Sequence, residues 1–380
     1  MVNDIRIHMA IIMYLIGCFS LMLYNAIVIF HKKNSTRAML NNTNKWIKIM
    51  HRQLSVENGM TSVNAKYKKY LLKKLKRVET LIAFSNALNY FKLEYGHDSY
   101  NQYLDALVES EVFHTLAIVY RHKKNEERAY FAYFISQYPQ LARNTEGILT
   151  DTANIIISYI EASDIYCRSN VLKALCSIGD THGIVNVMQL FSDKANFIHH
   201  RLLAEELFNF SGNKEELALH LWEKYKIWND NIMLGVITFI TMFSDTFKGA
   251  FLPMLQSKST DSEIRLAIIR YYKQYSYMPA QPVLMEYLNN TENYEFATEA
   301  AAALSEYPGQ DTVDALTSAL QSENWHVQYS AATSLVALGG YRHSYFNDLA
   351  SGGSGVLQII RYLLEHKVNE KDMNVSEAII

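Results

Sequence analysis

The sequence contains little proline, glycine or cysteine. Its 380 residues include 5 Pro and 15 Gly, which excludes collagen and low-complexity disordered chains. The three cysteines, Cys18, Cys167 and Cys176, are too few and too scattered for a disulfide framework or a zinc knuckle. We therefore expect a reducing compartment, no bound metal and no cofactor.

Common catalytic motifs are also absent. The chain has no G-x-x-x-x-G-K-S/T, G-x-G-x-x-G, G-x-S-x-G or H-E-x-x-H, so phosphate loops, nucleophile elbows and helical zinc proteases lack their marker. His199, His200 and His220 come closest to a ligand cluster, but no carboxylate stands beside them at metal-site spacing. We expect no catalytic residue and a non-enzymatic protein.

Charge is unevenly distributed along the chain. Residues 31–77 contain thirteen Lys or Arg and one acid, Glu57, whereas Val78 to Ile380 contain 22 basic and 36 acidic residues. A strongly basic segment therefore precedes an acidic body. Because the body is acidic, we expect no nucleic-acid partner.

The segment before the basic residues is apolar. From Ile7 to Phe30 there are 24 residues without Asp, Glu, Lys or Arg, which as a helix would span about 36 Å and cross a bilayer core of about 30 Å. A cleaved signal peptide would require a basic start, a shorter apolar run and a small-residue cleavage site, and a buried core helix would have to be apolar all round. The pattern favours a transmembrane helix.

The flanking charges predict its orientation. Lys32, Lys33 and Arg37 follow the span directly, whereas only Arg6 precedes it, partly offset by Asp4. Because cytoplasmic flanks carry excess Lys and Arg, we expect a single-pass protein of the cell membrane with its N-terminus outside and its body in the cytoplasm.

The basic segment has two interpretations. Between Lys45 and Leu54, Trp46 lies on an apolar helical stripe surrounded by basic residues, which suits a helix at the lipid headgroups. Anionic lipid contact would then involve Trp46, Lys66, Lys68, Lys69, Lys73, Lys74, Lys76 and Arg77. Alternatively, these charges are a topology signal on a solvated helix.

The strongest signal is an internal repeat. Taking one reference position n per unit, apolar residues recur at n+3, n+4, n+7 and n+10, except in the unit of Arg201, where Glu205 breaks the pattern, and Gly, Pro or Ser follows at n+11. The reference residues are Arg128, Arg168, Arg201, Met233, Arg265, Ala297 and Gln328. The closing residues are Pro139, Gly179, Gly212, Ser244, Ser276, Pro308 and Gly339. Each unit is therefore expected to contain a helix that ends at a defined turn.

Helix starts and partner helices complete each unit. The expected N-cap residues are Asp164, Asn229, Asp261, Asn293 and Asn324, with Asn196 one residue early. Amphipathic partner helices are expected at 183–191, 215–226, 247–256, 280–288 and 311–320. The pattern predicts antiparallel helical hairpins of about 32 residues.

The last unit resembles a known repeat. Residues Trp325 to Gly339 read W-H-V-Q-Y-S-A-A-T-S-L-V-A-L-G, which is similar to the V-R-x-x-A-A-x-x-L-x-x-L-G hallmark of HEAT repeats, with Gln328 where Arg is usual. Units this short resemble the variant named after phycobilisome lyases, although this says nothing about lyase activity. The resemblance implies an all-α, right-handed α-solenoid of about six to seven hairpins with a concave binding surface.

The expected domain order follows from these features. It comprises a short N-terminus (1–6), a transmembrane helix (7–30), a basic neck (31–77), a helical cap (78–125), HEAT-like repeats (126–349) and a C-terminal helix and tail (350–380).

In HEAT proteins the second helices line the concave side. The resemblance therefore implies a partner-binding surface that includes Arg168, Lys173, Arg201, Arg265, Tyr271, Gln328 and Tyr329. The alternative is structural, because Asp164 and Asp261 are spaced so that each could bind the reference Arg four residues later.

These observations favour a membrane-anchored, non-enzymatic scaffold or adaptor that binds a protein, itself membrane-associated. The Asn, Ile, Lys and Tyr usage fits a bacterial source, and single-span HEAT proteins of that kind resemble accessory subunits of envelope systems such as exopolysaccharide synthesis. A competing hypothesis is a ligand sensor or enzyme with a cleft near the irregular first repeat, where Arg128 and Arg168 are 40 residues apart. A third is a lipid-regulated tether in which only the neck is functional.

Overall fold

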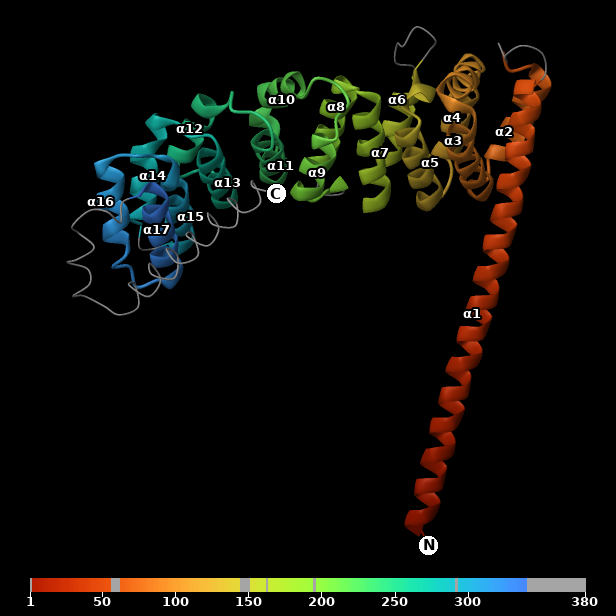
Figure 1. Ribbon diagram of the computed structural model, residues 1–380, viewed down its shortest axis with the longest axis horizontal. Helices are drawn as coiled ribbons and strands as arrows, with labels where there is room; N and C mark the ends of the chain where they lie inside the picture. The colour runs from red at the N-terminus through yellow and green to blue at the C-terminus, as the bar shows by residue number, and fades with distance from the viewer. Residues whose placement is uncertain are drawn as a thin grey trace, which may run out of the picture. The chain divides into compact units, whose positions relative to one another are not determined.

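The computed structural model describes residues 2–55, 62–143, 151–161, 163–193, 196–290 and 293–339. All the secondary-structure elements assigned in these ranges are helices (Figure 1). This confirms the all-α prediction. The chain divides into two compact units, Met1–Val187 and Met188–Ile380. The expected C-terminal helix and tail, 350–380, lie outside the described residues.

The first unit is built from two layers of helices. Its elements are α1 (Val2–Ser55), α2 (Ala65–Leu75), α3 (Val78–Glu109), α4 (Val112–Arg121), α5 (Asn125–Gln137), η1 (Pro139–Ala142), α6 (Thr152–Ile157), η2 (Ser158–Ile160) and α7 (Ile165–Ile178). Helix α1 packs on α3, α3 on α5, and α5 on α7, while α2 packs on α4 and α4 on α6. Odd-numbered helices therefore stack on odd-numbered ones, and even-numbered on even-numbered ones, as in a repeat protein. This arrangement includes the N-terminal helices, which were expected to form a neck and a cap.

The second unit repeats the same hairpin. Helix α8 (Thr181–Phe191) crosses the boundary between the units, and then follow α9 (His200–Phe208), α10 (Lys214–Glu223), η4 (Tyr225–Ile227), α11 (Asp230–Thr241), α12 (Lys248–Gln256), α13 (Ser262–Gln274), η5 (Met278–Ala280), α14 (Gln281–Leu288), α15 (Tyr294–Ala303), η6 (Leu304–Glu306), α16 (Gln310–Ala319) and α17 (Trp325–Leu338). The odd-numbered helices α9 to α17 pack on one another in order, and α10, α12, α14 and α16 each pack on the following odd helix. All five predicted partner helices are present.

The second helices begin where the sequence predicts. The Asp164 carboxylate accepts a hydrogen bond from the Cys167 amide at 2.8 Å, and the Asn229 side chain accepts one from the Ile232 amide at 2.9 Å. Asp261, Asn293 and Asn324 cap α13, α15 and α17 in the same way. Each cap satisfies amide groups that have no partner within the helix.

One predicted cap is wrong. Asn196 does not cap α9, because that helix begins at His200 and the His199 ring nitrogen Nδ1 accepts the hydrogen bond from the Arg201 amide at 3.2 Å. A backbone hydrogen bond from Asn196 to Asp193 O places Asn196 in the preceding turn instead.

Two helix ends are closed by glycine, as expected. Gly179 and Gly339 have φ angles of 79° and 75°, a left-handed conformation that side chains with a Cβ rarely adopt. At the other closing positions the regular helix ends earlier. Helix α9, for example, ends at Phe208, four residues before Gly212.

Tyrosines join neighbouring hairpins in the second unit. Tyr272 and Tyr307 are fully buried, and the Tyr272 hydroxyl donates to Lys248 O at 2.6 Å while the Tyr307 hydroxyl donates to Tyr272 O at 3.1 Å. A buried ring contributes hydrophobic stabilisation, and its hydroxyl requires a partner of this kind. Tyr272 and Tyr307 therefore belong to the core of the second unit.

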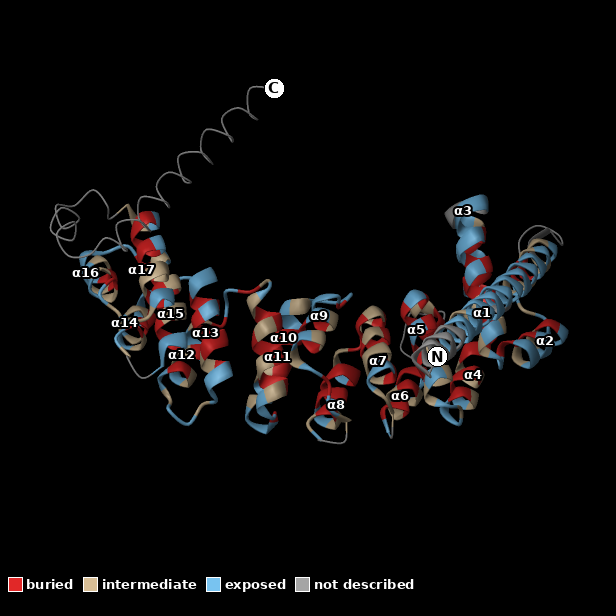
Figure 2. Cartoon of the chain, turned by 90° about the horizontal axis from the view of Figure 1, so that it is seen from below, coloured by how far each residue is buried: buried red, intermediate tan, exposed pale blue. Residues whose placement is uncertain are grey.

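Helix α1 connects the apolar segment to the core without a break. Its residues Met13 to Phe30 are exposed apart from the half-buried Cys18, and Figure 2 shows much of α1 in the pale blue of exposed residues. Further along the helix, Thr43, Trp46 and Met50 are buried. The Trp46 ring lies 5.7 Å from the Tyr70 ring and 5.0 Å from the Phe84 ring. The expected position of Trp46 at the lipid headgroups is therefore wrong, since α2 and α3 cover the apolar stripe that suggested it.

Helix α2 also belongs to the core. Its residues Tyr67, Leu71 and Leu75 are buried, and the Tyr67 hydroxyl lies 2.8 Å from the Tyr103 hydroxyl of α3. Helix α2 and the part of α1 around Trp46 and Met50, both within the segment expected as a neck, therefore belong to the folded body.

Candidate functional site

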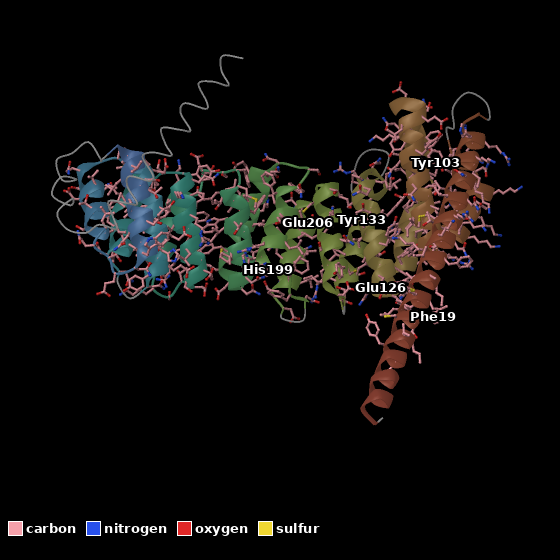
Figure 3. All side chains as sticks on the ribbon, turned by 60° about the horizontal axis from the view of Figure 1, so that its bottom comes forward. Phe19, Tyr103, Glu126, Tyr133, His199 and Glu206 are labelled. Atoms are coloured by element: carbon pink, nitrogen blue, oxygen red, sulfur yellow. The ribbon has the colours of Figure 1, made fainter. Side chains whose placement is uncertain are left out.

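The exposed part of α1 is the first candidate functional surface. Phe19 projects from a stretch of α1 that lies apart from the other helices of the first unit (Figure 3). Within the described residues, Met13–Gln53 is the one helix whose length and composition would allow it to cross a membrane, and none of its most apolar window is buried. These properties fit a membrane span, which remains a prediction.

A short basic stretch separates this surface from the body. Residues 32–38 are all exposed and include Lys32, Lys33 and Arg37, whereas the first buried side chain after them is Thr43. At about 1.5 Å per residue, the twelve residues from His31 to Asn42 correspond to roughly 18 Å of helix. The three basic residues therefore lie next to the apolar segment, and the body begins farther away.

The second basic surface is on α2. Lys66, Lys69, Lys73, Lys74, Lys76 and Arg77 are exposed and Lys68 is half-buried. Leu72 and the flanking Lys68, Lys69, Lys73 and Lys76 line an open groove of about 520 Å³. The predicted basic residues are thus accessible, although they belong to a helix whose Tyr70 contacts Trp46, sixteen residues beyond Phe30.

The residues predicted to bind a partner differ in exposure. In the first unit, Arg168 and Lys173 are half-buried, and the Lys173 ammonium lies 5.8 Å from the centre of the Tyr133 ring. In the second unit, Arg201 is exposed, whereas Gln328 and Tyr329 are half-buried. Their role in binding stays a prediction.

Tyr271 is not available for binding. Its side chain is fully buried and packs against the Phe251 ring at 4.7 Å, and burial raises the pKa of its hydroxyl. Its place on the predicted partner surface is therefore corrected, because α12 covers it.

Arg265 holds two hairpins together. Its guanidinium lies 4.8 Å from the centre of the Phe296 ring and donates to the Tyr287 hydroxyl at 3.2 Å, and that hydroxyl donates to Leu255 O at 2.7 Å. The alternative, in which the Arg265 guanidinium binds the Asp261 carboxylate, is not what the structure shows, since that carboxylate accepts from the amides of Glu263 and Ile264 and the two residues are joined by a backbone hydrogen bond from Arg265 N to Asp261 O. Arg265 is structural, but through other partners than expected.

The last described helix presents an aromatic pair that the sequence reading did not identify. Trp325 is 54% exposed, and its ring stacks on the Tyr329 ring at 5.2 Å. The Gln328 amide donates to Ser322 O at 2.6 Å and so fixes the preceding loop. The sequence contained a signal for this pair, because Trp325 directly follows the predicted N-cap residue Asn324 and lies in the first turn of the helix.

Two related clefts lie between hairpins of the second unit. One, of about 320 Å³, is lined by the end of α12, by Arg265 and by Tyr287 of α14. The other, of about 530 Å³, is lined by the end of α14, by Ala297 and by the end of α16. Because Arg265 and Ala297 are reference residues of consecutive units, the two clefts occupy equivalent positions.

A further cleft lies in the first unit, near the irregular repeat. It has a volume of about 440 Å³ and is lined by apolar residues together with Glu109, Glu111, His114, Arg143 and Asp151. The His114 ring nitrogen Nδ1 lies 3.2 Å from the Thr152 hydroxyl. Glu111 has φ 53°, and no other non-glycine residue of the described ranges has a positive φ. Such backbone strain is enriched at functional sites.

The histidines identified in the sequence do not form a metal site. His199 caps α9, and the His220 ring nitrogen Nδ1 lies 2.8 Å from Glu216 O. Burial, followed by the charges of His199 and Arg201, lowers the pKa of His200. Among the described residues, no group of three or more His, Cys, Asp or Glu side chains is arranged to hold a metal ion.

Comparison with known families supports the repeat assignment. The family described as HEAT repeats matches residues 250–336 and 282–350. These residues begin in α12 and include α13 to α17, where the hairpins and caps are most regular. No curated protein matches the chain significantly. Residues 250–350 are thus similar to HEAT repeats, and the secondary-structure elements of the described residues are all helices.

Proposed function

We propose that the protein is a membrane-anchored, non-enzymatic scaffold that presents its HEAT-repeat hairpins to another protein. The observation that carries this proposal is the continuity of α1, whose exposed apolar part and buried Trp46 and Met50 belong to one helix. A helix built in this way would hold the stacked hairpins next to a bilayer rather than on a flexible tether.

The flanking charges support a cytoplasmic position for the body. Lys32, Lys33 and Arg37 are exposed and directly follow the apolar stretch, so they are the residues best placed to contact anionic headgroups. The lysines of α2 belong to a helix that contacts α1 about 24 Å beyond Phe30, at 1.5 Å per residue, which exceeds two Debye lengths of about 10 Å. We assign lipid contact mainly to the first group and only secondarily to α2.

Protein binding is the role that stacked hairpins serve best. HEAT repeats generally form long surfaces for other proteins, because each unit buries its apolar face against its neighbours and leaves polar faces open. The exposed Trp325 and Arg201 in the second unit supply the residue types that dominate protein interfaces. A membrane enzyme of a bacterial envelope system, such as exopolysaccharide synthesis, is the partner class we propose.

Affinity purification from native membranes in mild detergent tests the proposal. The full chain is compared with a variant in which residues 7–30 are replaced by an unrelated transmembrane segment of equal length. A stoichiometric membrane protein recovered with both forms would support binding through the hairpins. Recovery with neither form would contradict the scaffold role, and recovery with the native span alone would place recognition inside the bilayer.

A second candidate function is ligand sensing at the cleft of the first unit. The strained Glu111 and the adjacent His114 favour it over the other clefts as a chemical site. A thermal-shift screen of small polar metabolites against the full chain, repeated with His114→Ala, would test it. A stabilising ligand that loses its effect in the variant is the expected result, and no shift with any compound would remove this candidate.

A further inference from the structure

The two equivalent clefts of the second unit differ in one feature. In the first, the reference residue Arg265 places its guanidinium against Phe296 and Tyr287. In the second, the reference residue is Ala297, which ends at Cβ, and the cleft is larger, about 530 Å³ against 320 Å³. The second cleft therefore lacks the cationic side chain that its neighbour contains.

The electrostatic environment of the larger cleft favours a cation. The last residues of two helices line it, Leu288 and Asn289 at the end of α14 and Ser318 and Ala319 at the end of α16. Helix C-termini carry partial negative charge from their last carbonyl groups. Ser318 O and Ala319 O each accept one hydrogen bond from the following turn, from the amides of Gln321 and Ser322, and each keeps a second lone pair. Glu323 adds a full negative charge, and none of the described lining residues is basic.

Other polar groups can accept or position a planar donor. Asn289, Gln321, Ser322 and Tyr294 line the same cleft, and the Ser322 hydroxyl also accepts a hydrogen bond from the Asn324 amide at 3.2 Å. A guanidinium offers five donors in one plane and also stacks on aromatic rings, as Arg265 does on Phe296. A guanidinium, with its planar donors and its ability to stack on a ring, therefore matches the polar and aromatic lining of the cleft better than a compact ammonium group does.

From this internal comparison, we propose that the cleft at Ala297 binds the guanidinium group of an arginine side chain presented by a partner protein. The arginine would occupy the space that Arg265 fills in the preceding hairpin, with Glu323 as its carboxylate partner. The inference rests on the proposed scaffold role, for which it names the chemistry of one contact.

The test uses the full chain in a neutral detergent and the peptide acetyl-Gly-Gly-Arg-Gly-Gly-amide, observed by saturation-transfer NMR. We expect saturable binding, and binding at least about tenfold weaker when citrulline or lysine replaces arginine, because citrulline lacks the charge and lysine lacks the planar donors. Equal binding of the three peptides, or no saturable binding of the arginine peptide, would overturn the proposal.

Substitutions then locate the site. Ala297→Arg should supply an internal guanidinium and abolish peptide binding, and Ala297→Met should block the same space without charge. Arg265 and Met233 occupy the equivalent positions in other units, so both side chains have a precedent in this fold. Glu323→Gln should weaken peptide binding about tenfold. The control is Glu306→Gln, which should leave peptide binding unchanged because the Glu306 carboxylate is exposed and does not line the cleft. Unchanged binding by Ala297→Arg would refute this location.

Failure of the inference is distinguishable from failure of the scaffold role. A membrane partner recovered equally by the wild type and Ala297→Arg would contradict the arginine contact while leaving the scaffold intact. Saturable peptide binding without any recovered partner would instead support the cleft and contradict the scaffold.

Discussion

Trp46 and Trp325 show how position decides the role of one residue type. Trp46 is 3% exposed and contacts rings on α2 and α3, whereas Trp325 is 54% exposed. From the sequence, both could be surface anchors, because each lies at helical spacing beside polar residues. Only the packing of helices distant along the chain separates the two cases.

Trp46→Ala should destabilise the first unit strongly. Loss of a buried tryptophan leaves a cavity and typically costs about 3–5 kcal/mol, while Trp325→Ala should cost less than about 1.5 kcal/mol, the value of one exposed aromatic pair. Chemical unfolding of the full chain in detergent measures both losses, with limited proteolysis around α1 to α3 as the local probe for Trp46→Ala and around α17 for Trp325→Ala. Similar losses for the two variants would contradict the buried position of Trp46.

The Tyr67 and Tyr103 hydroxyl pair predicts a loss of stability in alkali. Burial, opposed in part by the hydrogen bond with Tyr103, raises the pKa of Tyr67 to about 12, against about 10 when unfolded. Because the folded state favours the neutral phenol, this stabilisation is present below pH 10 and is lost as the pH rises from about 10 through 12. Tyr67→Phe should flatten that part of the stability profile, measured as Tm against pH. An unchanged profile would argue against the buried pair.

At the scale of elements, hairpin boundaries were predictable and α1 was not. The caps Asp164 and Asn324 and the terminators Gly179 and Gly339 act within one or two turns of their own helix, so local sequence is sufficient. The continuity of α1 depends on α2 and α3, which follow later in the chain. The difference between the cleft at Arg265 and the larger cleft at Ala297 likewise depends on contacts with the next hairpin. The identities of the reference residues alone do not predict these contacts.

Capping can be tested with a matched pair. Asp261→Ala removes an acceptor for two amides of α13 and should cost about 1 kcal/mol of stability. Asn196→Ala changes a residue that caps no helix and should stay within about 0.5 kcal/mol. Chemical unfolding of each variant provides the comparison, and a larger effect for Asn196→Ala would restore it as the cap of α9.

The rigidity of α1 is measurable as a distance distribution. Spin labels attached through unnatural amino acids at positions 22 and 45 are separated by 23 residues, or about 34 Å in a continuous helix. Pulsed electron resonance in lipid nanodiscs should give a narrow distribution near that value, and Ser35→Pro should broaden or shorten it, because proline bends a helix interior. A broad distribution in the wild type would show a hinge between the apolar segment and the body.

For the whole molecule, the orientation that we propose in a membrane depends on a few charges. The exposed Lys32, Lys33 and Arg37 follow the apolar part of α1, and the same helix enters the folded body without a break. If these charges retain the C-terminal side in the cytoplasm, the acidic hairpins and the cleft at Ala297 face cytoplasmic partners.

Replacing Lys32, Lys33 and Arg37 by Gln while adding lysines before Ile7 should therefore send the body across the membrane in a fraction of molecules. Protease protection of sealed vesicles measures that fraction, with the lysine additions alone as the control. A body already protected from cytoplasmic protease in the wild type would reverse the topology and, with it, the class of partners proposed for the repeats.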